Sequence, residues 1–236
     1  EMLDTNSVYL ANELPKLGIT LKKTISIGDE LEDIQTTITQ ELQDSDIIIT
    51  TGGMGPTSDD LTRESIAGYC GEKMSVDEEQ LRTLKELFKN RGQQMPSTNI
   101  KQASLIPSAV AIPNSRGTAP GWMVKKDEKV IVALPGPPAE LMNMWNKYIV
   151  PSLKSLDASE VFVTRNIKSF GISEGELDGK FSHLFGLGNP FLGIYSKQDG
   201  IHLRIIAHSK THKKARKLIA PIEEEIVHSI GASIWG

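Results

Sequence analysis

Three glycines and two carboxylates stand close together in the segment TTGGMGPTSDD, residues 50–60. Gly52, Gly53 and Gly55 follow a short apolar run, and glycine lets a backbone approach a ligand closely. A strand that ends in a glycine loop before a helix directs backbone N–H groups at an anion, and phosphate is the usual ligand. The segment therefore predicts a phosphate-binding loop.

This loop matches neither of the common nucleotide-binding motifs. It lacks the lysine of GxxxxGK[ST], and its glycine spacing is not that of GxGxxG. Asp59 and Asp60 close it at the expected start of a helix, where a carboxylate repels a bare phosphate unless a divalent cation lies between them. The alternative is that both residues only cap the helix. We favour a magnesium–phosphate site, because α/β proteins bind ligands at the carboxyl end of parallel strands.

Hydrophobic periodicity predicts the elements that position this loop. Expected helices cover residues 5–17 (with a kink or early end at Pro15), 31–42, 59–70, 77–90 and 138–148. Expected strands cover residues 19–27, 46–51, 122–125 and 130–134, the last two joined as a hairpin. The alternation predicts an α/β fold: a three-layer, doubly wound domain with a mostly parallel sheet over residues 1–152.

The pattern changes after a polar stretch at residues 151–158, which we interpret as a linker. Expected strands then cover residues 161–167, 191–195 and 201–208, and expected helices cover 173–185 and the segment from Thr211 onward. This β-α-β-β-α order predicts a second, smaller α+β module over residues 159–236.

Composition favours a globular cytoplasmic protein. Of 236 residues, 39% are hydrophobic and 24% charged, and a net charge of -4 gives no bulk attraction to nucleic acid or to an anionic membrane. Cys70 is the only cysteine, so no internal disulfide is expected, and no apolar stretch approaches the roughly 18 residues that span a bilayer. The basic run at residues 210–217 is interpreted as a solvated helix face, so nucleic-acid binding is not expected.

Several segments resemble one known family in the same order along the chain. TTGGMGPTSDDLTRE, DTNSVYLANELPKLGI, IGDELEDI, NSRGTAPGW and ALPGPPAEL are similar to the molybdopterin-binding-like domain of the CinA family of competence/damage-inducible proteins. FGISEGELDGKF and GNPFLGIYSKQDGIHLRI resemble the KH-like module of the same family. The resemblance therefore implies a molybdopterin-binding-like domain followed by a KH-like module.

The resemblance also implies roles for individual residues. Asp60 is expected to hold a divalent metal such as Mg²⁺, and Asp29 is expected to face the same pocket and to orient or deprotonate a water. Substrate binding is expected of the glycines and of the residues around them. These are Asn6, Thr51, Gly52, Gly53, Gly55, Asp59, Thr62, Asn114, Gly117, Gly136 and Pro137.

The implied activity is hydrolysis of a nucleotide, ADP-ribose, to AMP and ribose 5-phosphate, with a divalent metal and possible K⁺ activation, in a homodimer. One alternative is binding of molybdopterin phosphate or adenylyl transfer, against which Asp59 argues because those relatives usually carry arginine there. Another is a non-catalytic module that binds nucleotide or nucleic acid for competence. Family members start with a strand that this sequence lacks, so the first strand is expected to be missing. Long members end in a deamidase domain, and no deamidase activity is predicted here.

Overall fold

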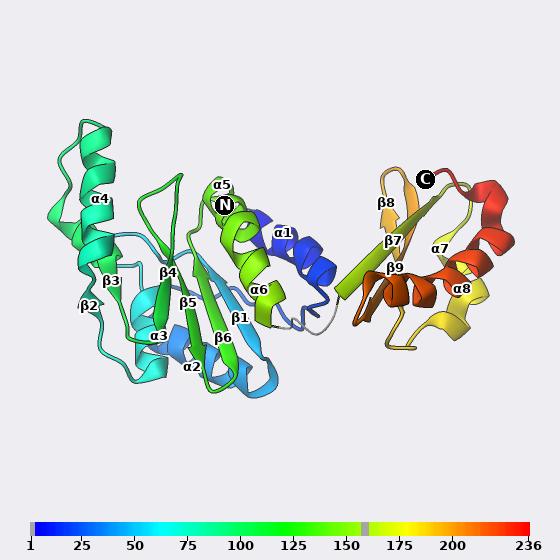
Figure 1. Ribbon diagram of the computed structural model, residues 1–236, viewed down its shortest axis with the longest axis horizontal. Helices are drawn as coiled ribbons and strands as arrows, with labels where there is room; N and C mark the ends of the chain where they lie inside the picture. Colours follow the sequence, from blue (N-terminus) through cyan, green and yellow to red (C-terminus); the bar gives the residue numbers. More distant parts are fainter. Residues whose placement is uncertain (1–2, 157–160) are drawn as a thin grey trace. The chain divides into compact units, whose positions relative to one another are not determined.

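The computed structural model describes residues 3–156 and 161–236, which form two compact units (Figure 1). Unit 1 consists of Glu1–Tyr9 and Lys22–Ser152, and unit 2 consists of Leu10–Leu21 and Leu153–Gly236. No helix in the described part of the chain is long and apolar enough to cross a bilayer.

A four-stranded sheet in the order β1-β6-β5-β4 forms the centre of unit 1 (Figure 1). Its strands are β1 (Ile47–Thr51), β4 (Ala109–Ile112), β5 (Gly121–Lys126) and β6 (Lys129–Leu134), and the short strands β2 (Ser75–Val76) and β3 (Ser104–Leu105) pair separately. β1 pairs in parallel with β6, whereas β6–β5 and β5–β4 are antiparallel. The predicted α/β class is confirmed. The sheet is mixed rather than mostly parallel, because the hairpin expected at residues 122–134 supplies an antiparallel pair.

Helices cover both faces of this sheet. In unit 1 they are α2 (Leu31–Asp44), α3 (Thr62–Cys70), α4 (Glu78–Asn90) and α5 (Pro138–Met144), with the 3-10 helix η2 (Ser97–Ala103) and a π-helical turn η3 (Trp145–Ile149). Two helices start in unit 1 and end in unit 2, namely α1 (Thr5–Glu13) and α6 (Val150–Leu156), and the 3-10 helix η1 (Leu14–Leu17) belongs to unit 2. Ile38 of α2 and Ile66 of α3 share one buried cluster with Trp122 and Ile131 of the sheet. On the other face, a Cβ atom on Gly121 would lie 2.8 Å from Cε of Met144. The expected three layers are therefore present.

The strand expected at residues 19–27 is wrong. Residues 19–28 have no regular secondary structure, and the side chains from residue 20 to residue 29 are exposed. The apolar alternation is present in the sequence, but a strand requires a neighbour for its backbone groups, and no described strand pairs with this segment. β1 is consequently an edge strand and is half-buried, not covered on both faces as its apolar sequence indicates.

The linker expected at residues 151–158 is wrong over its first six residues, which belong to α6, and its last two lie outside the described residues. Trp145, Ile149 and Leu153 are buried and continue the apolar face of α5. Pro151 cannot donate a backbone hydrogen bond and crowds the preceding turn. The wider π-helical turn just before it accommodates this proline within a continuous helix.

Unit 2 contains a three-stranded antiparallel sheet in the order β7-β9-β8. Its elements are β7 (Val161–Ser169), α7 (Glu174–Phe181), η4 (Ser182–Leu184), β8 (Phe191–Lys197), β9 (Gly200–Ser209), α8 (His212–Ile230) and η5 (Gly231–Ser233). Leu177 and Phe181 of α7 pack with Ile219 and Ile226 of α8 over one face of this sheet. The Thr211 hydroxyl accepts from the Lys214 amide at the start of α8. The expected β-α-β-β-α order is confirmed.

Candidate anion-binding site at the sheet edge

Three loops leave the same edge of the unit 1 sheet. Thr51 of β1 pairs with Leu134 of β6, and Ala133 pairs with Trp122 near the start of β5. The glycine loop after β1, residues 135–137 after β6 and residues 114–120 before β5 therefore meet there. This is the carboxyl end of the parallel pair, where α/β folds bind ligands.

The glycine loop leaves two adjacent amides free. Gly52 and Gly53 have φ values of +101° and +64°, which favour glycine. The Gly52 amide donates to the Leu134 carbonyl at 2.9 Å and so extends the parallel pairing. The amides of Gly53 and Met54 donate to no acceptor within residues 3–156 and 161–236. The loop therefore carries two successive N–H groups that lack a protein acceptor, that of half-buried Gly53 and that of buried Met54, and successive amides of this kind suit an anion.

Thr62 fastens the loop to the start of α3. Its hydroxyl donates to the Gly52 carbonyl at 2.8 Å, and its amide donates to the Gly53 carbonyl at 3.2 Å. A Cβ atom on Gly53 would lie only 2.2 Å from the Thr62 hydroxyl oxygen, so this close approach requires glycine. Thr51, the last residue of β1, is half-buried just before the loop.

Asp60 closes the loop through its side chain. Its Oδ1 accepts from the Gly55 amide at 2.8 Å, and its Oδ2 accepts from the Thr57 amide at 2.9 Å and from the Thr57 hydroxyl at 2.5 Å. A Cβ atom on Gly55 would lie 2.3 Å from Oδ2, so the third glycine makes room for this carboxylate.

The alternative that the two aspartates cap α3 is wrong. α3 begins at Thr62, three residues later than expected, and its N-cap residue Leu61 makes no side-chain hydrogen bond. Asp59 is exposed and has no hydrogen bond or ion pair with any described residue.

The environment of Asp60 favours its charged form. Burial by itself would raise the pKa of this carboxyl group. Hydrogen bonds from Thr57 and from the Gly55 amide, together with the positive charge of Lys101, outweigh that effect and lower the pKa below 3.8. Asp60 is therefore ionised at neutral pH.

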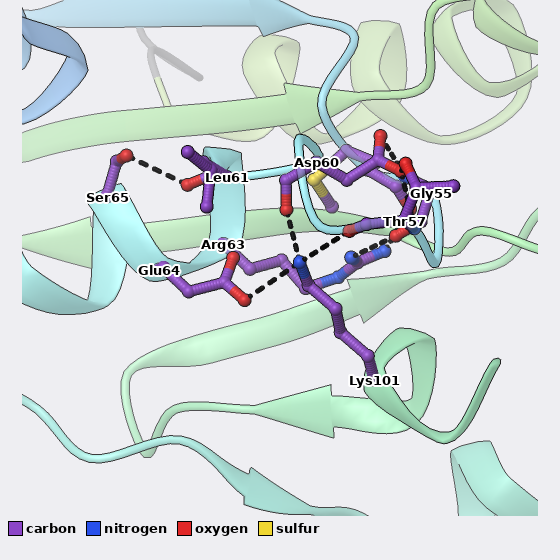
Figure 2. A network of polar contacts seen from close by, with 9 residues as sticks. Gly55, Thr57, Asp60, Leu61, Arg63, Glu64, Ser65 and Lys101 are labelled. Atoms are coloured by element: carbon purple, nitrogen blue, oxygen red, sulfur yellow. Dashed lines mark hydrogen bonds and ion pairs between the residues drawn. The ribbon is translucent and has the colours of Figure 1, made fainter. Parts of the chain in front are cut away.

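Two cations, Arg63 and Lys101, hold the loop through its carbonyl oxygens (Figure 2). The Arg63 guanidinium is fully buried and donates to the carbonyls of Met54 and Gly55. Lys101, from η2, donates to the carbonyls of Thr57, at 3.1 Å, and Asp60, and it pairs with Glu64 at 3.0 Å. Sequence reasoning missed both residues. Arg63 lies directly beside the recognised motif, whereas Lys101 has no local signal because it is 41 residues from Asp60.

Arg63 places a positive charge beneath the loop. Burial lowers the pKa of its guanidinium to about 10, while the negative charges of Glu64 and Asp60 act in the opposite direction. The group therefore remains charged at neutral pH. Its Nε atom is buried and has no partner among the described residues. This N–H is thus an unused donor of a buried cation, and the positive charge of Arg63 favours an anion at the neighbouring amides.

The second loop is anchored by Asn114 and Glu140. The Asn114 amide group donates to Glu140 Oε2 at 2.6 Å, and its Oδ1 accepts from the amides of Arg116 and Gly117. A Cβ atom on Gly117 would lie 2.1 Å from Glu140 Oε2. Glu140, from α5, is a carboxylate at this edge of the sheet that sequence reasoning did not single out.

Asn6 and Gly136 connect α1 with the third loop. Asn6 Nδ2 donates to the Gly136 carbonyl at 2.7 Å, and a Cβ atom on Gly136 would lie 3.6 Å from the Gly52 Cα atom. Asn6 Oδ1 is buried and has no donor among the described residues. The next residue, Pro137, is exposed at the start of α5.

Asp29 is not joined to this cluster by any contact that the structure records. It is exposed in the segment before α2. The predicted catalytic role of Asp29 stays a prediction.

The side chains at this edge do not form a protein-built metal site. No three His, Cys, Asp or Glu side chains gather as ligands in the described part of the chain. Both oxygens of Asp60 already accept hydrogen bonds from the loop. Mg²⁺ is commonly held by one or two carboxylates together with substrate phosphates, so it is the use of both Asp60 oxygens within the loop that argues against Asp60 as its ligand.

Two known protein families match successive parts of this chain. The family described as "Probable molybdopterin binding domain" matches residues 1–155, and the one described as "Damage-inducible protein CinA KH domain" matches residues 164–236. A CinA-like protein of Thermomicrobium roseum is 38% identical over 235 residues, and one of Deinococcus radiodurans is 39% identical over 240 residues. These alignments cover 100% of this chain but only 58% and 59% of the relatives, so the chain spans about three fifths of their length.

One solved structure is also similar. It is described as the protein CinA with unknown function from Thermoplasma acidophilum, is 31% identical and has a TM-score of 0.60. The match covers 64% of this chain and 88% of that protein.

Proposed function

We propose that this chain, which belongs to the CinA-like family, hydrolyses a nucleotide pyrophosphate, and that ADP-ribose is cleaved to AMP and ribose 5-phosphate. In this reaction the oxygen of a water molecule bonds to one phosphorus atom, and the bond from that phosphorus to the bridging oxygen breaks. The bridging oxygen stays on the other phosphate group, and the protons of the water are released or taken up by the two products. The observation that supports the proposal most strongly is the pair of free amides at Gly53 and Met54 on a glycine loop at the carboxyl end of β1.

A pyrophosphate fits the chemistry of this edge. Its oxygens would accept from the amides of Gly53 and Met54, and the buried charge of Arg63 would stabilise them from behind the loop. Asn6 Oδ1, which is buried and unpaired, would accept from a sugar hydroxyl. Backbone amides, an acceptor and a buried cation together suit a phosphorylated sugar better than an apolar ligand.

Two carboxylates could activate the attacking water, and we assign this role to Asp29. Asp29 is exposed and free to approach a bound substrate, whereas Glu140 is already held by Asn114 at 2.6 Å. A carboxylate that takes the proton of a positioned water typically contributes about 10²–10⁴-fold to the rate. Replacing Asp29 should therefore lower kcat far more than it changes KM.

The experiment that tests this proposal measures AMP release from ADP-ribose. Wild type is compared with Asp29→Asn and with Asp33→Asn, an exposed aspartate of α2 that makes no recorded hydrogen bond. Turnover by wild type and Asp33→Asn, with kcat reduced at least about 10²-fold in Asp29→Asn, supports the proposal. Absence of turnover in a folded wild-type protein refutes it, and unchanged kcat in Asp29→Asn removes that residue from the mechanism.

The same amides could hold the phosphate of a pterin, which the description of the matched molybdopterin binding domain favours. Tight binding of molybdopterin with adenylyl transfer from ATP, and no AMP release from ADP-ribose, would establish that alternative. Nucleotide or oligonucleotide binding without turnover would instead indicate a non-catalytic module, with steep salt dependence for an oligonucleotide.

Three further parts of the proposal concern the setting of the reaction. A divalent metal and K⁺ are proposed as activators, and adding each to EDTA-treated protein measures their effect. A homodimer is proposed as the active state, and sedimentation at several concentrations measures it. A cytoplasmic location is proposed because nucleotide substrates are available there, and fractionation of cells measures it.

A further inference from the structure

We infer that Asp60 is a positioning residue that clamps the anion-binding loop from inside, and that it is not a ligand of a protein-held metal. This inference rests on the proposed function for what the loop binds, but the contacts that carry it are internal to the protein. The role of Asp60 thereby changes from the expected metal ligand to a residue that holds the loop in shape.

The first argument concerns the hydrogen bonds that the Asp60 carboxylate already accepts. Three donors from Gly55 and Thr57 lie 2.5–2.9 Å from the two oxygens of Asp60. A Ca²⁺ or Mg²⁺ ligand needs an oxygen whose lone pairs are directed at the ion. Oδ2 already accepts two hydrogen bonds and Oδ1 accepts one, so three of the roughly four acceptor positions of the carboxylate are used within the loop, and the close approach of Gly55 crowds Oδ2.

The second argument concerns charge. Asp60 interacts electrostatically with two cations of the protein. The charge of Lys101 lowers the pKa of Asp60, and the charge of Asp60 raises the pKa of Arg63. Lys101 uses its donors on the Thr57 and Asp60 carbonyls and on Glu64. The site therefore balances the Asp60 carboxylate without a metal, and neither Lys101 nor Asp60 is left to meet the ligand.

The third argument concerns which backbone groups of the loop these side chains bind. Arg63 and Lys101 bind carbonyl oxygens of the loop, and Asp60 binds the amides of Gly55 and Thr57. Within residues 52–55, every backbone carbonyl and amide thus has a partner among the described residues, except for the amides of Gly53 and Met54. The clamp fixes the turn that presents these two amides, so an incoming phosphate pays little to order them. A divalent ion required for turnover would accordingly enter with the pyrophosphate.

Asp60→Asn separates the two roles, and Asp33→Asn is the matched control. Asparagine keeps one acceptor oxygen but turns an NH₂ group toward a backbone N–H donor in either orientation. We expect no stoichiometric Mn²⁺ site by electron paramagnetic resonance in wild type or in either variant without nucleotide. We also expect hydrogen exchange at the Gly55 and Thr57 amides to rise at least about tenfold in Asp60→Asn, as for one lost hydrogen bond to a charged group.

Two further readouts distinguish a local clamp from a general loss of stability. Exchange at the buried Val132 amide of β6, which requires unfolding of the sheet, should rise in Asp60→Asn only by the factor that the loss of unfolding free energy gives. In wild type, the NMR shifts of the Gly55 and Thr57 amides should titrate in acid below pH 3.8, and in Asp60→Asn they should not.

A stoichiometric Mn²⁺ site in nucleotide-free wild type that disappears in Asp60→Asn would overturn the inference. Unchanged exchange at Gly55 and Thr57 in that variant would overturn it equally. None of these measurements uses ADP-ribose, so a protein that fails to cleave ADP-ribose refutes the proposed function without altering their outcome.

Discussion

Replacing Gly55 with alanine should break the clamp without removing any functional group. The new Cβ atom would lie 2.3 Å from Oδ2 and 2.8 Å from Cγ of Asp60, and the carboxylate cannot swing away without leaving the amides of Gly55 and Thr57. A hydrogen bond to a charged group contributes about 1.5–3 kcal/mol. Because Thr57 is exposed and water can replace part of the loss, we expect unit 1 to lose about 2 kcal/mol in its free energy of unfolding.

Urea unfolding followed by tryptophan fluorescence measures this loss. Trp122 and Trp145 are fully buried in unit 1, so a Trp235→Phe background confines the signal to that unit. With an m-value of about 2 kcal/mol/M, the midpoint should fall by about 1 M urea. Gly28→Ala is the control, because nothing lies within 4 Å of its Cβ position, and its stability should be unchanged or higher by up to about 1 kcal/mol. Equal midpoints for the two variants would refute the steric argument.

Three other predictions follow from individual contacts. Lys101→Met removes both carbonyl contacts and the Glu64 pair and should cost about 1–3 kcal/mol, whereas the exposed Lys85→Met should stay within about 0.5 kcal/mol by the same urea assay. Because the pKa of Asp60 is lowered in the folded state, its contribution to stability is present above pH 3.8 and is lost as the pH falls through the folded pKa. The difference in unfolding free energy between wild type and Asp60→Asn should therefore shrink below about pH 4. A difference that stays constant with pH would contradict this prediction. Gly179→Ala within α7, where the new methyl group meets nothing within 4 Å, should raise the melting temperature of unit 2 through a gain of about 0.5–1 kcal/mol, and a lower melting temperature would contradict it.

Local sequence determined the elements whose signals lie within a few residues. The apolar spacing of Ile34, Ile38 and Leu42 gives α2 its inward face, and the segment at 122–134 forms the expected hairpin. The hairpin turn is tight enough that Asp127 and Glu128 adopt positive φ angles. The glycine loop was also predictable, because strand, glycines and helix follow one another directly along the chain.

Tertiary structure decided the features that depend on distant partners. The segment at 19–27 alternates like a strand, but strand pairing is a contact with another segment, and no described strand supplies it. Burial of Trp145 and Ile149 carries a helix through a polar stretch that resembles a linker. Propensity could not indicate this outcome, since packing outweighs it there.

The same division holds at the site. Residue types near Gly53 predicted an anion-binding loop, but not which of its groups would lack a protein partner. Asp60 was expected to meet a metal, whereas the fold directs its carboxylate to its own loop. Lys101 binds the Asp60 carbonyl from 41 residues away in sequence, and Asn6 binds the Gly136 carbonyl from 130 residues away. Sequence thus determined the chemistry available, and folding decided which of those groups the protein uses for itself, because hydrogen-bond partners are set by distance in space.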